Sequence, residues 1–152
     1  MYRRIRRPKE QEEYYTKLTD RAEFGIFASY KDVFMAAGMM GFIEKKKKPF
    51  TNSLDGINWN VFNMETDEVI INAVAISETG DYSLINTDDE TFDRKMQIYE
   101  EYAAGGLEAL YKKVMEEPKR ALSIYVDLLM SLEAETTSKD RNLKHIADLL
   151  TF

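Results

Sequence analysis

The sequence of 152 residues has no cysteine, which excludes disulfide bonds and thiolate zinc sites. It has a single histidine, His145, and it contains no Walker loop, no dinucleotide-binding glycine motif and no paired-histidine metal motif. No serine nucleophile stands in a known catalytic motif. These absences predict a protein without catalytic residues, metal or cofactor, and we expect it not to be an enzyme.

Long apolar runs are missing as well. No stretch approaches the roughly 20 apolar residues that cross a membrane, and the N-terminal arginines are not followed by the apolar segment of a secretion signal. Together with the absence of cysteine, this predicts a soluble cytoplasmic protein that does not bind membranes. The length predicts one domain, which at this size buries about 68 to 70% of the surface of the unfolded chain.

Charge is distributed unevenly along the chain, whose net charge is -6. Residues 1–50 carry 12 Lys and Arg against 7 Asp and Glu, which gives +5, whereas residues 51–152 carry 9 against 20, which gives -11. A basic segment on an acidic body is typical of proteins that meet a polyanion through the basic part. The alternative is a solvated surface on which charges cluster by chance.

A buried helix over about residues 30–40 is the centre of the predicted fold. Ser29 is suited to cap its first turn, and Gly41 is suited to end it in the left-handed conformation. Between them only Lys31 and Asp32 are charged. A helix that is apolar on all sides belongs in the interior of a protein.

Helices are also predicted on both sides of this central one. Pro8 is suited to begin a helix that runs to about Ala22. Residues 65–79 fit either a buried strand or a buried helix, and the acidic start and Gly80 at the end favour the helix. The loop over residues 45–56 is expected at the surface because it begins with four lysines, with Trp59 anchoring its end to the core.

One long helix is predicted from residue 88 to about Glu117. Apolar or small residues recur there at steps of three and four, and the rhythm crosses Gly105 and Gly106 without a break. Each of two glycines inside a helix is unfavourable by about 1 kcal/mol relative to alanine. We therefore expect that the pair is there to allow another backbone to approach closely. A break of the helix at the pair is the alternative. The acidic residues near Asp88 could be considered a metal site, but capping of the helix that follows explains them better.

Two further helices are predicted after Pro118, the second capped by Thr137 or Ser138. The first would bury Leu122 and Leu129, among others. The predicted fold class is therefore mainly α, a compact single-domain bundle of about six helices, with a short extended or strand segment at residues 2–7. Its parts are a basic arm (1–7), a core (8–117) and a C-terminal helical extension (118–152).

The strongest candidate site is the basic arm, together with a lysine run in the loop after the central helix. Arginine matches the geometry of phosphate, and a cationic segment gains affinity for nucleic acid by releasing counterions. The alternative is that these side chains pair with carboxylates of the same chain or of a second copy. The candidate nucleic-acid-binding residues are Arg3, Arg4, Arg6, Arg7, Lys45, Lys46, Lys47 and Lys48.

A basic extended segment, Pro8, a helix, a glycine-containing turn and a helix capped by Ser29 together resemble the ribbon-helix-helix family of DNA-binding proteins. In that family the strands of two subunits pair and enter the major groove. The resemblance implies a homodimer that reads bases with Arg4 and Arg6. The segment departs from the family pattern in one respect, because Ile5 is its only apolar residue that could face the interior of such a dimer.

Five segments, spread from the arm to about residue 117, carry a second resemblance; they are Arg3–Pro8, Tyr30–Met35, Gly41–Phe42, Glu78–Asp81 and Glu101–Leu107. With these segments the sequence resembles a family encoded with the genes for DNA phosphorothioation (Dnd), the Dnd system-associated protein 4 family. The resemblance implies a bacterial defence context, with modification and restriction of DNA by its sulphur marks, and it implies no catalytic residues.

The leading hypothesis is a non-enzymatic accessory protein of such a system that contacts DNA, or a DNA-bound partner, through the basic arm. Other Dnd-system proteins are the expected protein partners. The alternatives are a dimeric ribbon-helix-helix transcription regulator and a protein-protein adaptor that does not contact nucleic acid.

Overall fold

The computed structural model describes residues 2–133, apart from the side chain of Asp55. The chain divides into two compact units, residues 1–112 and 113–152. The mainly α fold class is confirmed. The helix predicted after Thr137 lies outside the described residues.

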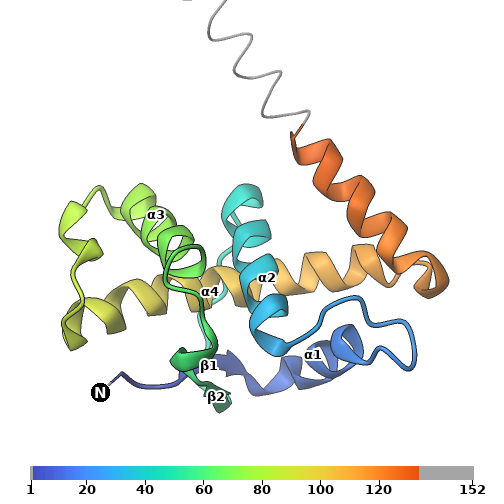
Figure 1. Cartoon of the computed structure of the whole chain (residues 1–152), viewed down its shortest axis with the longest axis horizontal. Helices are drawn as coiled ribbons and strands as arrows, with labels where there is room; N and C mark the ends of the chain where they lie inside the picture. Colours follow the sequence, from blue (N-terminus) through green and yellow to red (C-terminus); the bar gives the residue numbers. More distant parts are fainter. Residues whose placement is uncertain (1, 134–152) are drawn as a thin grey trace, which may run out of the picture. The chain divides into compact units, whose positions relative to one another are not determined.

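The first unit combines a small sheet with helices, and α4 runs through it as the longest element (Figure 1). Short 3-10 helices connect several of the elements. The elements of the chain in order are β1 (Ile5–Pro8), η1 (Lys9–Gln11), α1 (Glu12–Thr19), α2 (Tyr30–Glu44), β2 (Ser53–Ile57), η2 (Trp59–Val61), α3 (Asp67–Thr79), η3 (Tyr82–Ile85), α4 (Asp89–Val114) and η4 (Pro118–Arg120).

Helix α2 is the predicted central helix. Its N-terminus is capped as expected, because the Asp32 amide donates a hydrogen bond to Ser29 Oγ at 3.3 Å. The prediction that Gly41 ends the helix is wrong: α2 continues to Glu44, and Lys45 takes the left-handed conformation at φ 57°. Met39 is also exposed, so the helix is not covered on every side.

Gly41 is needed for packing rather than for termination. A side chain at Gly41 would collide with the carbonyl oxygen of Tyr102 in α4, and one at Gly106 would collide with the carbonyl oxygen of Ala37 in α2. The backbones of α2 and α4 therefore lie in direct contact. Helix α4 is continuous across Gly105 and Gly106, which confirms the predicted helix and its close approach.

The N-terminal segment forms a strand within its own chain. β1 pairs antiparallel with β2, with Ile5 opposite Ile57 and Pro8 opposite Ser53. The expected surface loop thus contains a strand that the sequence pattern did not predict. A side chain at Gly56 would collide with the carbonyl oxygen of Ile5, so the irregular pairing between the strands requires glycine there.

Helix α3 and its surroundings follow the sequence pattern. α3 ends at Gly80, whose φ of 71° is left-handed, and this confirms the helical interpretation of residues 65–79. Trp59 is buried and stacks on Phe62 with ring centroids 4.8 Å apart. The predicted cap of α4 is also present, because the Thr91 amide donates to Asp88 Oδ1 at 2.9 Å.

The second unit contains η4 and a helical segment over residues 121–133. The prediction that Leu122 and Leu129 are buried is wrong, because their exposed fractions are 61% and 46%. No described helix has both the length and the apolar character needed to cross a membrane.

Candidate functional site

The alternation of side chains along β1 separates the arginines of the basic arm into two environments. Ile5 and Arg7 are buried on the inner face, whereas Arg4 is exposed and Arg6 is half-buried. The sequence placed cations on both faces of an extended arm. In the folded protein only the outer face of β1 remains in contact with solvent.

Arg3 and Arg6 share a carboxylate of α4, that of Glu100, whose side chain has no exposed surface. The two Nη atoms of Arg3 donate to Glu100 at 2.8 and 2.9 Å, and Arg6 Nη2 lies 3.4 Å from the same group. The backbone amide of Arg6 also donates to Glu100. Arg3 additionally lies 3.2 Å from Asp93. This carboxylate therefore fixes β1 against α4.

Arg7 is held inside the unit by a different set of groups. Its guanidinium pairs with Glu12 and lies over the rings of Tyr15 and Tyr30, at 5.0 and 4.7 Å from their centroids. Glu12 also accepts a hydrogen bond from the Tyr30 hydroxyl at 3.2 Å. Arg7 is thus a structural residue and has little surface to offer a ligand.

Most of the lysine run is paired with carboxylates in the same way. Lys46 lies 3.1 Å from Glu44, and Lys47 lies 2.5 Å from Glu78. Lys48 contacts two carboxylates, Glu10 at 2.8 Å and Glu108 at 2.5 Å. Hydrogen bonds to these two groups raise the pKa of Lys48 above its usual range.

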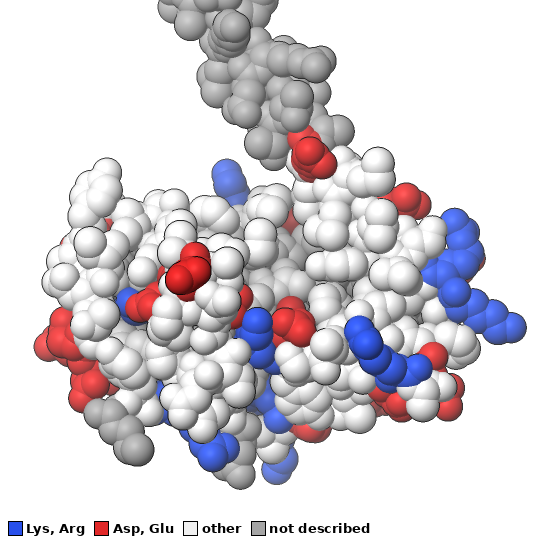
Figure 2. Space-filling model, viewed as in Figure 1, with Lys and Arg blue, Asp and Glu red and all other residues white. Residues whose placement is uncertain are grey.

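Two of the eight predicted site residues have no ion-pair partner in the described part of the chain. Among the described side chains, no carboxylate lies within ion-pair distance of Arg4 or Lys45, and both residues are exposed. Arg4 donates one long hydrogen bond, of 3.5 Å, to the carbonyl oxygen of Gly56. On the face seen in Figure 2, Lys and Arg lie among Asp and Glu, without an unbroken basic surface. Most cations of the two basic segments are therefore paired with carboxylates of the same chain.

The two edges of β1 are both engaged. One edge pairs with β2, and on the other the amide of Arg6 donates to the carboxylate of Glu100. A ribbon-helix-helix dimer needs a free edge at which the strand of a second subunit can pair. The described part of the chain leaves β1 without such an edge.

Buried ionisable side chains elsewhere connect one element to another. Lys95 of α4 is fully buried and lies 3.7 Å from Glu68 of α3, and burial lowers its pKa. Lys31 of α2 lies 3.0 Å from the buried Asp67 at the start of α3. Within the described residues, no group of three or more His, Cys, Asp or Glu side chains is placed to hold a metal.

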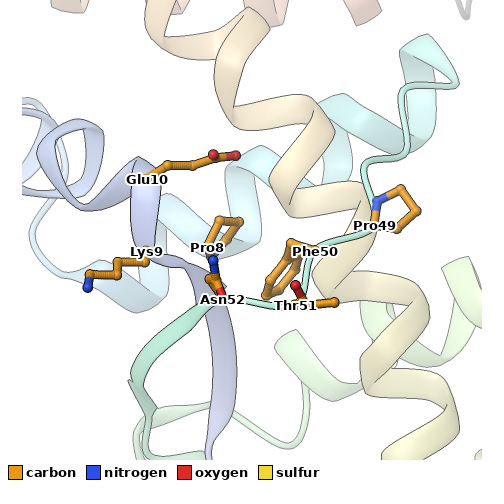
Figure 3. Close-up of a pocket in the computed structure, with 7 residues that line it drawn as sticks. All are labelled: Pro8, Lys9, Glu10, Pro49, Phe50, Thr51 and Asn52. Carbon is orange, nitrogen blue, oxygen red and sulfur yellow. The ribbon is translucent and has the colours of Figure 1, made fainter.

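A pocket beside the outer face of β1 was not predicted from the sequence. It lies where β1 ends and the loop before β2 passes, and Figure 3 shows its residues extending from these two segments. Phe50 does not belong to a recognisable motif. The one signal in the sequence is its position directly after the lysine run and Pro49. The pocket is lined by Pro8, Lys9, Glu10, Pro49, Phe50, Thr51 and Asn52.

Comparison with protein families gave one assignment over nearly the whole chain. Residues 4–148 match the model of the family described as DNA sulphur modification system-associated protein 4. Comparisons with curated proteins and with solved structures gave no match. The matched range contains both basic segments, the pocket and α4. This chain therefore belongs to the DNA sulphur modification system-associated protein 4 family.

Proposed function

We propose that this chain is a non-enzymatic accessory protein of a DNA sulphur modification system, and that it contacts DNA through the outer face of β1. The observation that carries the proposal is the family match over residues 4–148. The role would be one of binding rather than of chemistry. In support, the buried ionisable groups Glu100, Lys95 and Asp67 pair with other elements and so hold the fold together.

The DNA contact would use fewer cations than the sequence suggests. Arg3 and Arg7 are held by carboxylates of their own chain, so their release would leave Glu100 and Glu12 without partners. Arg4 is exposed, and Arg6 is only partly engaged. These two arginines are the ones that could face phosphate groups of DNA.

Duplex binding by single variants tests this contact. In the proposed mode, Arg4→Ala weakens binding of a 20-base-pair duplex and lowers the dependence of log affinity on log salt by about 0.9. Arg21→Ala is the matched control, because Arg21 is an exposed arginine outside the β1 face. Equal effects of both variants, or no duplex binding by the wild type, would overturn the DNA contact.

A second candidate function is an adaptor that binds only proteins of the same system. It is favoured by the pairing of Arg3, Arg7 and Lys46–Lys48 with carboxylates, which leaves little basic surface. In that case the tagged full-length chain co-purifies with proteins of the modification system after nuclease treatment. Co-purification that depends on DNA favours the first proposal instead.

A deletion tests membership of the working system directly. In a host that carries the system, loss of the gene should change sulphur modification of the DNA or the restriction that depends on it. Restoration by the wild-type chain, and unchanged modification enzymes in the deletion strain, would support an accessory role. A deletion without effect on either process would contradict it.

A further inference from the structure

The pocket beside β1 has an apolar floor. Its volume is about 580 Å³, and the rings of Pro8, Pro49 and Phe50 form much of its lining. Figure 3 shows Phe50 beside Pro8, with Glu10 extending over one side and Lys9 extending outward. Pro8 is buried, whereas Pro49 is exposed and Phe50 is half-buried. The accessible rings of Pro49 and Phe50 suit a ligand group that is weakly hydrated.

The walls of the pocket are held in place before any ligand binds. The Lys9 amide donates to the Asn52 carbonyl oxygen at 3.0 Å, which ties the end of β1 to the loop. The Lys48 amide donates to the Glu101 carbonyl oxygen at 2.9 Å, which ties the same loop to α4. Binding would therefore require little ordering of the backbone.

Arg6 supplies a positive charge next to this floor. Its guanidinium lies 5.7 Å from the centroid of the Phe50 ring, and its Nε is buried without a hydrogen-bond partner among the described residues. Its link to Glu100 is long, at 3.4 Å, and Arg3 donates to both oxygens of the same carboxylate. Because Arg3 also lies 3.2 Å from Asp93, two guanidinium groups face two carboxylates here, and Arg6 offers a further anion the N–H donors that Glu100 does not use.

The carboxylate at the rim of the pocket is partly compensated. Glu10 lies 2.8 Å from Lys48, which also lies 2.5 Å from Glu108, so the two carboxylates share one ammonium group. Lys9 is exposed at the same rim and adds a cation. The pocket therefore combines apolar surface with one lining cation, Lys9, and Arg6 lies beside it over the Phe50 ring.

A phosphorothioate diester matches this combination better than an ordinary phosphate diester. In it a sulfur replaces one non-bridging oxygen, so the group keeps its single negative charge. Sulfur is larger and more polarisable than oxygen and is less strongly hydrated, so less free energy is lost when it leaves water. An ordinary phosphate would lose the strong hydration of the oxygen that replaces it against the same rings.

Resting on the proposed function, we propose that this pocket binds a phosphorothioate linkage of sulphur-marked DNA. The sulfur lies against the rings of Pro49 and Phe50, and the remaining non-bridging oxygen of the linkage faces Arg6. The pocket thereby gives the chain a preference for marked DNA over unmarked DNA.

Paired duplexes of identical sequence test the preference by fluorescence anisotropy. One duplex carries a single phosphorothioate linkage, with its two stereoisomers measured separately, and the other carries phosphate at that position. The wild type should bind one phosphorothioate isomer about tenfold more tightly than the phosphate duplex. Phe50→Ala and Pro49→Gln should bind both duplexes within twofold of each other, whereas the control Arg21→Gln should keep the tenfold preference.

Pro49 is exposed, so Pro49→Gln keeps the test valid where Phe50→Ala disturbs the fold, which circular dichroism reports. Equal affinity of the wild type for both duplexes, no binding to either, or a preference that survives Pro49→Gln would overturn the proposal. Failure here is distinct from failure of the proposed function, because an accessory role revealed by gene deletion is compatible with equal affinities.

Discussion

Glu100 accepts hydrogen bonds from both Nη atoms of Arg3, at 2.8 and 2.9 Å, with a carboxylate that is completely buried. Arg3 precedes β1, and Glu100 lies in the middle of α4. The pair joins segments 97 residues apart in the sequence. It turns an N-terminal segment that reads as a free basic arm into part of the folded unit.

Glu100→Gln tests this role. The variant leaves Arg3 and Arg6 without their shared counter-charge, but both arginines are partly exposed and can be hydrated. We therefore expect the free energy of unfolding to fall by about 2 kcal/mol, less than for a fully buried pair. Urea denaturation measures it. Glu13→Gln, which breaks the exposed pair with Lys17, should leave the free energy of unfolding almost unchanged, because solvent screens that pair.

The contact between α2 and α4 gives a second prediction. Gly106→Ala places a methyl group against the Ala37 carbonyl oxygen, so the helices must separate, and the free energy of unfolding should fall by about 3 kcal/mol. Gly80→Ala is the comparison, because Gly80 has open space around it and only its left-handed φ is unfavourable. It should lower the free energy by about 1 kcal/mol. Equal effects would contradict the close packing.

Lys95 predicts a dependence of stability on pH. Burial lowers its pKa in the folded protein below the ordinary 10.5, so in the interval between the two values the unfolded chain binds more protons. The free energy of unfolding contributed by this group therefore rises with pH through that interval. Lys95→Met removes this rise and, since Glu68 is partly exposed, should leave the protein at least as stable at neutral pH.

The measurement is the difference in denaturation midpoint between the wild type and Lys95→Met from pH 7 to pH 10. The denaturation midpoint of the wild type should rise relative to that of the variant as the pH increases. A constant difference would show that Lys95 does not change its protonation on folding. The raised pKa of Lys48 acts in the opposite direction at higher pH, but it is common to both proteins.

The sequence predicted the elements whose signals are local. The steps of three and four across Gly105 and Gly106 were sufficient to predict a continuous α4, and Ser29 and Gly80 marked helix ends correctly. Gly41 was assigned the wrong role, because a glycine required by a distant carbonyl oxygen, that of Tyr102, looks the same in sequence as one that ends a helix.

The candidate site depended on long-range partners and was predicted less well. The basic segments were visible as residue types, and pairing with the chain's own carboxylates was the stated alternative. The spacing of residues in the sequence could not predict that Arg3 pairs with Glu100 or that Lys48 pairs with Glu108. Strand β2 was missed for the same reason, since it forms against β1 and its own sequence resembles a loop.

The salt dependence of duplex binding tests the central claim most directly: that the fold holds most of the basic arm and leaves only Arg4 and Arg6 to contact DNA. Two neutralised phosphates predict a slope of log affinity against log salt of about -1.8. The Arg4→Ala variant should bring it to about -0.9. A wild-type slope near -3.6 would mean that all four arginines engage DNA and would contradict the account, as would the absence of binding at low salt.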